Sequence, residues 1–199
     1  MQPTPAPYPT TFTFDAPERI TNWRPFVQWI MAIPHWIIAN ALNSLGEAIG
    51  IVSWFIIVFT GALPESLANL QCMIIRYATR NFTYAGFLRE EYPPFAFDMT
   101  AHDPGSDPRV RLDFQPQLAN RNRATVFFRI ILVIPHVVVL AFLIVAAVVV
   151  YFIAAFAILF TGKWPEGMRN FVLGVMRWGL RVQTYFALLT DEYPPFALN

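Results

Sequence analysis

The 199-residue chain carries 56% hydrophobic and 16% aromatic residues, and only 14% of its residues are charged. Soluble domains average about 25% charged residues, so this composition and the mean hydropathy of +0.44 favour a membrane protein. Fourteen Lys and Arg residues nearly balance thirteen Asp and Glu residues, which argues against a nucleic-acid-binding protein. The single cysteine, Cys72, excludes an internal disulfide and a multi-cysteine zinc site.

Residues 1–22 read as a polar N-terminal tail. The first fifteen residues are rich in Pro and Thr and contain no apolar segment typical of a secretory signal. They also contain no cysteine that could carry a lipid. We therefore expect an integral protein that has no cleaved signal peptide.

Two long stretches of the chain are almost free of charge. Residues 25–64 contain a single charged residue, Glu47, and residues 130–162 contain none. Pro34 and Pro135 interrupt these stretches, and proline disfavours a helical conformation in the residue before it. The apolar part after each proline is long enough to cross a hydrocarbon core of about 30 Å. The predicted membrane helices are residues 36–60 and 137–161.

The chain is a tandem repeat. When the sequence is shifted by 101 residues, residues 23–96 align with residues 124–197 without a gap, with 25 identities in 74 positions. A weaker match, shifted by 98 residues, pairs Phe14-Asp15 with Leu112-Asp113. We therefore divide the chain into repeat 1 (23–96), a charged linker that contains Pro and Gly (97–122) and repeat 2 (123–199).

Each repeat contains the same motifs in the same order. An Ile-Pro-His motif precedes the apolar helix, which ends at Phe-Thr-Gly, and a second helix ends before Tyr-Pro-Pro-Phe. The predicted second helices are residues 65–88 and 166–189. The motif residues are Pro34, His35, Tyr92, Pro93, Pro94 and Phe95 in repeat 1, and Pro135, His136, Tyr193, Pro194, Pro195 and Phe196 in repeat 2.

The second helix of each repeat carries an arginine stripe. Arg76 and Arg80 share one face in repeat 1, Arg177 and Arg181 share it in repeat 2, and Arg169 lies on the same arc. A helix of this kind can lie in the headgroup layer, where its arginines bind anionic lipid or simply orient the helix. It can also span the bilayer with its arginines turned into a bundle, so both two and four crossings stay open.

One polar face interrupts the apolar helix of repeat 1. Its residues are Asn40, Asn43, Ser44 and Glu47, whose counterparts in repeat 2 are Ala141, Ile144, Val145 and Val148. Three interpretations stay open for this face. It can contact a partner helix, with Gly46 and Gly50 allowing close approach. It can form a turn that brings Glu47 to water, or it can be an ion or substrate site.

Catalytic and metal-binding patterns are absent from the sequence. It contains no phosphate-binding glycine loop, no His-Glu-x-x-His and no Gly-x-Ser-x-Gly. His35 and His136 could form a paired site, but without acidic or thiol neighbours they make a weak ligand set, and helix capping explains them better. We expect a protein that is not an enzyme and uses no metal or cofactor.

The motifs resemble those of an uncharacterised family of bacterial integral membrane proteins that bear a domain of unknown function. The second copy, with Arg177-Trp178 and Asp191-Glu192-Tyr193-Pro194-Pro195-Phe196, is the closer match. In the first copy Tyr77 replaces the tryptophan. The resemblance implies an integral bacterial membrane protein, and it implies no activity. From the repeat pattern we expect an all-α membrane protein, located in the bacterial plasma membrane.

The absence of a reaction centre leads to three functional hypotheses. The first is an accessory or scaffold subunit that packs against a larger membrane protein complex through the polar face of repeat 1. The second is a lipid-binding or membrane-shaping module that uses the arginine stripes. The third is a small channel or transporter with Glu47 in its path.

Overall fold

The computed structural model describes residues 8–199, which form six helices and two short strands. The predominance of helix agrees with the sequence prediction, whereas the two strands were not expected from an all-α reading. The elements are β1 (Thr10–Phe14), α1 (Arg24–Met31), α2 (Ile33–Thr60), α3 (Glu65–Ala85), β2 (Val110–Phe114), α4 (Arg123–Phe127), α5 (Arg129–Thr161) and α6 (Glu166–Phe186).

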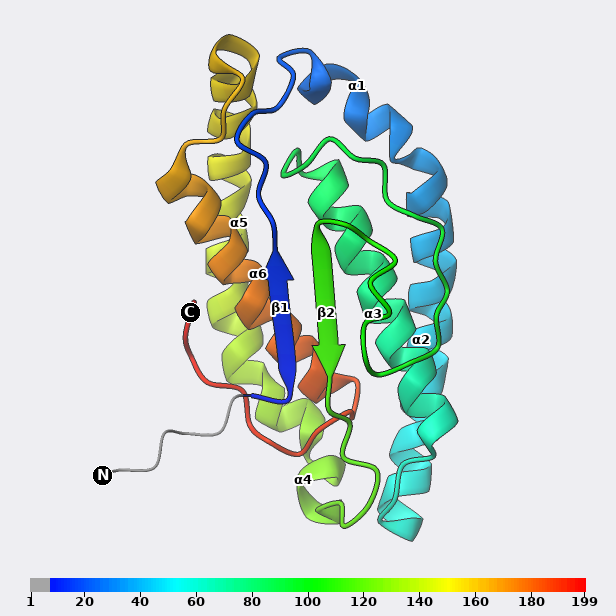
Figure 1. Ribbon diagram of the computed structural model, residues 1–199. Coiled ribbons are helices and arrows are strands. Elements are labelled where there is room, and N and C mark those ends of the chain that lie inside the picture. Colours follow the sequence, from blue (N-terminus) through cyan, green and yellow to red (C-terminus); the bar gives the residue numbers. More distant parts are fainter. Residues whose placement is uncertain (1–7) are drawn as a thin grey trace, which may run out of the picture.

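The two repeats meet at a central antiparallel ribbon (Figure 1). Strand β1 pairs with β2 so that Phe12 lies opposite Leu112 and Phe14 opposite Val110. A shift of 98 residues makes Phe12 equivalent to Val110 and Phe14 equivalent to Leu112, so it exchanges these two pairs, as an approximate two-fold axis between the repeats requires. The N-terminal tail and the linker thus contribute strands to the core and do not act as free polar segments.

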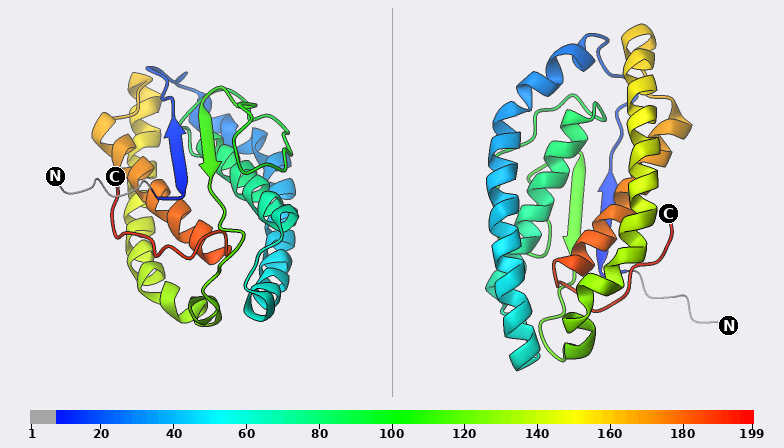
Figure 2. Two further views of the ribbon diagram at one scale, coloured as in Figure 1. Left: turned by 60° about the horizontal axis from the view of Figure 1, so that its bottom comes forward. Right: turned by 180° about the vertical axis from the view of Figure 1, so that it is seen from behind.

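The long helices α2 and α5 lie antiparallel on the side of the molecule away from the ribbon (Figures 1 and 2). Both begin earlier than residues 36 and 137, where the sequence placed them. The chain changes direction at Ala32, two residues before Pro34, and at Phe128. Pro135 lies inside α5 and does not end the helix, so the predicted break at this residue is not seen.

The apolar helices end where the Phe-Thr-Gly motif predicts. Gly61 and Gly162 cap α2 and α5 with φ angles of +75° and +68°, in the left-handed region that glycine adopts without strain. The next helices, α3 and α6, begin directly after Pro64 and Pro165. The motif therefore marks a helix–turn–helix connection in each repeat.

Helices α3 and α6 lie between the ribbon and the long helices, and most of the core is built from them. The long helices are different. In α2 and in α5 alike, only 17% of an 18-residue apolar stretch is buried. Large apolar side chains such as Phe55, Phe59, Phe142, Phe152 and Phe160 are exposed. The molecule therefore presents an apolar surface on α2 and α5 and a polar layer around the ribbon.

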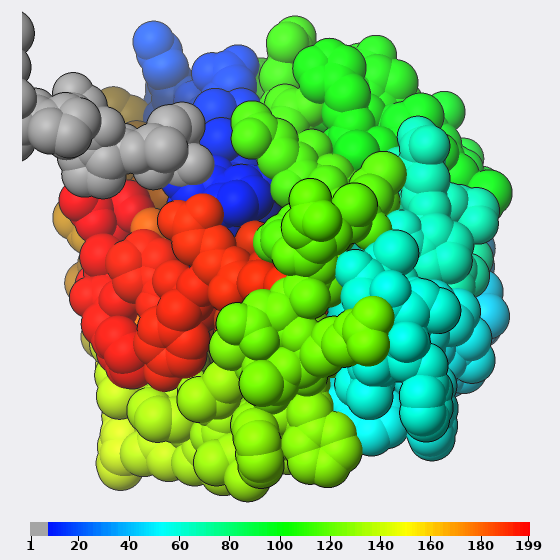
Figure 3. Space-filling model, turned by 90° about the horizontal axis from the view of Figure 1, so that it is seen from below, coloured from blue at the N-terminus to red at the C-terminus, as the bar shows by residue number. Residues whose placement is uncertain are grey.

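The Ile-Pro-His and Tyr-Pro-Pro-Phe motifs contact each other within each repeat. His35 stacks on Phe95 with ring centroids 4.2 Å apart, and His136 stacks on Phe196 at 3.9 Å. Figure 3 shows the C-terminal segment, in red, packed against the start of α5. Both histidines are fully buried. They join the end of each repeat to the start of its long helix.

Each histidine is held by a second partner from the following helix. Nδ1 of His35 lies 2.7 Å from the hydroxyl of Tyr77, and Nε1 of Trp178 donates to Nδ1 of His136 at 3.1 Å. Tyr77 and Trp178 occupy equivalent positions, so the Tyr-for-Trp difference between the repeats preserves the contact. The two histidines belong to separate clusters and do not form a paired site.

Candidate functional site

The arginine stripe of repeat 1 faces the linker. Arg76 and Arg80 are each 2% exposed, which leaves them no surface for lipid headgroups. The guanidinium of Arg76 donates to the backbone oxygens of Leu112, Asp98, Thr100 and Ala101. The expected contact of these two arginines with lipid is therefore not seen, because the linker folds over them.

Asp103 of the linker supplies the charge that balances these arginines. Its carboxylate lies 2.9 Å from Nη2 of Arg80 and 3.5 Å from Nε of Arg76. It also accepts hydrogen bonds from the backbone N–H groups of Leu112 and Gly105. Burial acts to raise the pKa of Asp103, but these hydrogen bonds and the two arginines outweigh it and hold the pKa below its usual value.

The equivalent arginines of repeat 2 are less covered. Arg177 and Arg181 are half-buried, and neither has an acidic partner within residues 8–199. Arg181 donates to the backbone oxygen of Ala197, and Arg169 lies half-buried near the start of α6. These three arginines are thus the only members of the predicted headgroup set with accessible surface in the described chain.

The polar face of α2 is solvent-accessible. Asn40, Asn43, Ser44 and Glu47 all lie within one continuous helix, so the predicted turn at this point is not present. Gly46 and Gly50 face the neighbouring helix α3, where an added Cβ would lie 3.3 Å and 3.9 Å from the side-chain amide of Gln71. The close approach that these glycines allow is therefore internal to repeat 1.

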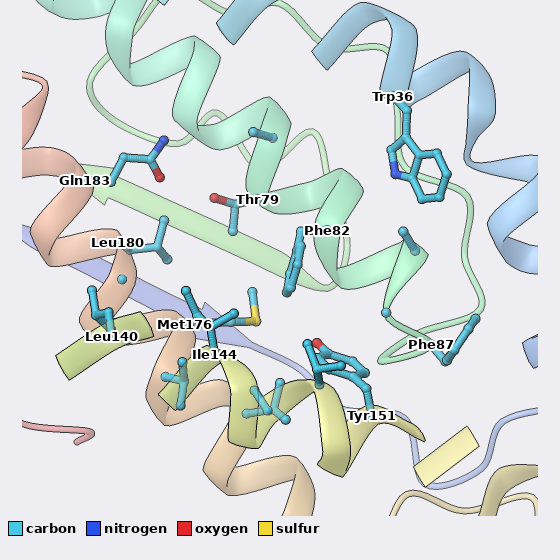
Figure 4. A pocket seen from close by; sticks show the side chains of 18 residues that line it. Trp36, Thr79, Phe82, Phe87, Leu140, Ile144, Tyr151, Met176, Leu180 and Gln183 are labelled. Atoms are coloured by element: carbon cyan, nitrogen blue, oxygen red, sulfur yellow. The ribbon is translucent and has the colours of Figure 1, made fainter. Parts of the chain in front are cut away.

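A cavity of about 810 Å³ lies between the two repeats (Figure 4). Its walls come from α3, α5 and α6, with Trp36 of α2 at one side, and both strands pass behind it in Figure 4. Almost all of its lining is apolar. The side chains that define it include Trp36, Phe82, Leu140, Ile144, Val148, Tyr151, Val175, Met176 and Leu180.

The polar face of α2 follows Trp36, the residue of this helix that lines the cavity. Asn43 and Glu47 follow Trp36 by seven and eleven residues, which places all three on one edge of the helix. Their counterparts in repeat 2, Ile144 and Val148, line the cavity from α5. Asn43 and Glu47 themselves are exposed and are not part of the cavity lining, to which α2 contributes Trp36.

Tyr151, which lines the cavity, carries a buried polar atom without a partner in residues 8–199. The hydroxyl of Tyr151 is buried and has no hydrogen-bond partner among the described residues. It lies against Gly86, where an added Cβ would be 2.8 Å from the hydroxyl oxygen. Figure 4 shows the Tyr151 side chain on α5 at the edge of the cavity nearest Phe82 and Phe87. Within the described chain, Tyr151 thus brings a buried, unpaired hydroxyl to a mostly apolar lining that also contains Trp36, Thr79 and Gln183.

Residues 8–199 contain no group of three His, Cys, Asp or Glu side chains that could hold a metal ion. The cavity residues were not found from the sequence, because their common wall depends on the packing of two repeats. The sequence differences between the two repeats were an indication of the cavity, since polar residues of α2 correspond to apolar residues of α5.

Comparison with known families gives one match, and it covers both repeats. The sequence family described as Domain of unknown function (DUF4389) matches residues 22–96 and 123–197. The chain belongs to this family. The prediction of an uncharacterised family present as two tandem copies is thereby confirmed. No curated protein and no solved structure shows significant similarity to the chain.

Proposed function

We propose that this protein is a membrane-associated lipid-binding protein that holds an apolar chain in the cavity between its repeats. The observation that carries the proposal is the cavity itself, which has a volume typical of sites for small ligands and an apolar lining. Helices with large exposed apolar surfaces flank it. An acyl or isoprenoid chain can therefore enter from a bilayer without crossing water.

The exposed apolar surface of α2 and α5 supports membrane association. Both helices are long and apolar enough to cross a bilayer, yet little of either is covered by the rest of the protein. The core helix of a soluble protein would be mostly buried, and monomeric soluble proteins rarely expose a large apolar patch. We therefore propose that the surface of α2 and α5 opposite the ribbon contacts the lipid interior.

The position of the polar layer indicates how the protein is oriented relative to the membrane. The ribbon lies alongside the long helices and not beyond their ends (Figures 1 and 2). It carries exposed polar groups, including Thr11, Thr13 and Arg111, and the nearby His102 side chain is 88% exposed. Polar groups of this kind are costly in hydrocarbon. We propose that α2 and α5 lie along one leaflet, with the ribbon toward water.

The polar edge of α2 favours the hypothesis that the ligand is amphiphilic, with a polar part as well as a hydrocarbon chain. With its chain in the cavity, such a ligand would place its polar part toward Asn43 and Glu47, which lie on the same edge of α2 as Trp36. The hydroxyl of Tyr151 is buried beside the cavity without a partner in the described chain, and it would donate to an ester or carbonyl oxygen of a ligand that reaches it. Pairing this hydroxyl would remove the cost of a buried unsatisfied donor, about 1–3 kcal/mol.

Two glycines of α6 provide a matched test. An added Cβ at Gly179 or at Gly167 meets no atom within 4 Å, but only Gly179 lines the cavity. Gly179→Leu should project a branched side chain into the cavity and block binding of a fluorescent long-chain phospholipid to the purified protein, whereas Gly167→Leu should bind like the unmodified protein. Equal binding by both variants would contradict the proposal.

A second candidate function is that of an accessory subunit in a larger membrane complex. It is favoured by the exposed apolar side chains of α5, which could pack against another membrane helix as well as against lipid. Mass spectrometry of material purified in mild detergent separates the two candidates. A stoichiometric protein partner supports the accessory role, and a co-purifying lipid without such a partner supports the lipid-binding role.

A further inference from the structure

The arginine pair of repeat 2 lacks the counter-charge that its counterpart in repeat 1 receives. In repeat 1, Asp103 lies within 2.9 Å of Arg80 and 3.5 Å of Arg76, deep in the protein. The equivalent residues of repeat 2 are Arg181 and Arg177. No acidic side chain within residues 8–199 forms an ion pair with either.

The sequence explains this difference. Asp103 precedes strand β2 and belongs to the linker that folds over α3. At the shift of 98 residues that matches Phe14 with Leu112, Asp103 corresponds in sequence to Pro5, and residues 1–14 contain no Asp or Glu. The sequence before β1 therefore supplies no acidic counterpart of Asp103.

A small pocket of about 150 Å³ lies beside the arginine pair. It is lined by both arginines, by Tyr8, Thr10, Thr11 and Phe12 at the start of β1, and by Leu180 and Asn199. The phenol of Tyr8 donates to the backbone oxygens of Arg181 and Glu192, which fixes this wall of the pocket. The pocket is near the volume of a few water molecules and is large enough for one oxoanion.

We propose that this pocket of repeat 2 binds an oxoanion, a phosphate or a carboxylate, which would neutralise Arg177 and Arg181 as Asp103 neutralises Arg76 and Arg80 in repeat 1. The ligand would be held by Arg177 and Arg181, since guanidinium groups bind such anions through charge-assisted hydrogen bonds. Burial and the like charge of Arg177 lower the pKa of Arg181, and an anion would offset this repulsion. This site is independent of the cavity proposed to hold the lipid chain.

The anion could be a lipid headgroup or a free ion, and two probes distinguish these sources. The first is inorganic phosphate, titrated against the thermal stability of the full chain in neutral detergent. The second is a nanodisc of phosphatidylcholine with or without phosphatidylglycerol. A saturable stabilisation by phosphate identifies a free-anion site, and stabilisation by phosphatidylglycerol alone identifies a headgroup site.

Three variants make the test specific. Arg177→Gln and Arg181→Gln should each weaken binding of the effective probe about tenfold, because each removes a charge-assisted contact. Arg177→Glu supplies an internal counter-charge one helical turn from Arg181 and should abolish the response while the protein stays folded. Arg111→Gln, an exposed arginine on β2, is the control and should respond like the unmodified protein. No response to either probe, or an equal response in all variants, would overturn the proposal.

Discussion

Gln28 and Arg129, which stand 101 residues apart, hold the ends of their repeats in the same way. Nε2 of Gln28 donates to the backbone oxygens of Tyr84 and Arg89 at 2.7 and 2.5 Å. Nη1 of Arg129 donates to those of Tyr185 and Thr190 at 2.7 and 2.6 Å. The accepting residues are again equivalent pairs, so a hydrogen-bonding function is preserved although the residue type differs.

This equivalence predicts that glutamine can replace Arg129 better than leucine can. Arg129→Gln retains a donor for the two backbone oxygens, and Asp191 keeps its ion pair with Arg121 at 2.7 Å. Arg129→Leu leaves the buried oxygens unpaired. We expect a loss of about 1–2 kcal/mol for glutamine and about 3–5 kcal/mol for leucine in chemical unfolding followed by circular dichroism. Equal losses would show that the charge, and not the hydrogen bonds, is what stabilises this end.

The contact between His136 and Phe196 predicts a measurable coupling between two motifs that are 60 residues apart. The two rings are stacked with an interplanar angle of 16°. In a double-mutant cycle with His136→Ala and Phe196→Ala, the coupling should be about 0.5–1.5 kcal/mol. The same cycle on His35 and Phe95 serves as the matched case in repeat 1. Additive losses in both repeats would mean that the motifs do not stabilise each other.

Stability should fall in acid because two carboxylates are paired in the folded state. Ion pairs and backbone hydrogen bonds outweigh burial and lower the pKa of Asp103 and of Asp191. A carboxyl group whose pKa is lower in the folded state stabilises the fold at pH values above its pKa in the unfolded chain, about 3.9. This stabilisation is lost as the pH falls through the pKa of the group in the folded protein. The midpoint of thermal unfolding should therefore decrease below about pH 4.

Variants at the same carboxylates check this interpretation. Asp103→Asn should destabilise the protein at neutral pH by about 3–5 kcal/mol, because it leaves Arg76 and Arg80 without a counter-charge. It should also flatten the acid dependence of the unfolding midpoint. Asp98→Asn, at an exposed position of the same linker, should do neither. An acid dependence that is unchanged in Asp103→Asn would assign the effect to other groups.

Tyr151→Phe separates the hydrogen bond to the ligand from the shape of the cavity. The phenyl ring fills the same space, and the unpaired hydroxyl is removed. The ligand-free protein should be stabilised by about 1 kcal/mol, while binding of a phospholipid should weaken severalfold. Unchanged lipid affinity would show that the hydroxyl takes no part in binding.

Single cysteines test how α2 lies in the membrane. In a Cys72→Ala background, Trp23→Cys and Thr60→Cys mark the two ends of the α1–α2 segment, and both positions are exposed. If α2 lies along one leaflet, an impermeant maleimide will label both ends from the same side of sealed vesicles. Labelling from opposite sides would instead show that α2 spans the bilayer. Val145→Cys, on the exposed apolar surface of α5, should be protected.

The repeat, the helix–turn–helix connection and the motif order were predictable from the sequence because they depend on local signals. Phe-Thr-Gly ends each long helix at a glycine with positive φ, and a proline opens the next helix. The strands were missed because each has five residues and its partner lies about a hundred residues away. The weak sequence match of Phe14-Asp15 with Leu112-Asp113 was the one indication of these strands that we found in the sequence.

The positions of the arginines were not predictable from one helix at a time. The stripe of α3 has the spacing of a surface helix, and only the folded linker shows that Arg76 and Arg80 are neutralised by Asp103. The cavity has a similar origin, because its walls come from both repeats. Helical periodicity places side chains on a face of one helix, but it does not say which second helix covers that face.

Native mass spectrometry of the purified chain, with Gly179→Leu and Gly167→Leu measured beside it, is the most direct test of lipid binding in the cavity. The unmodified protein and Gly167→Leu are expected to retain one bound lipid per chain, and Gly179→Leu is expected to retain none. The absence of bound lipid from the unmodified protein, or equal retention by both variants, would contradict a lipid site between the repeats.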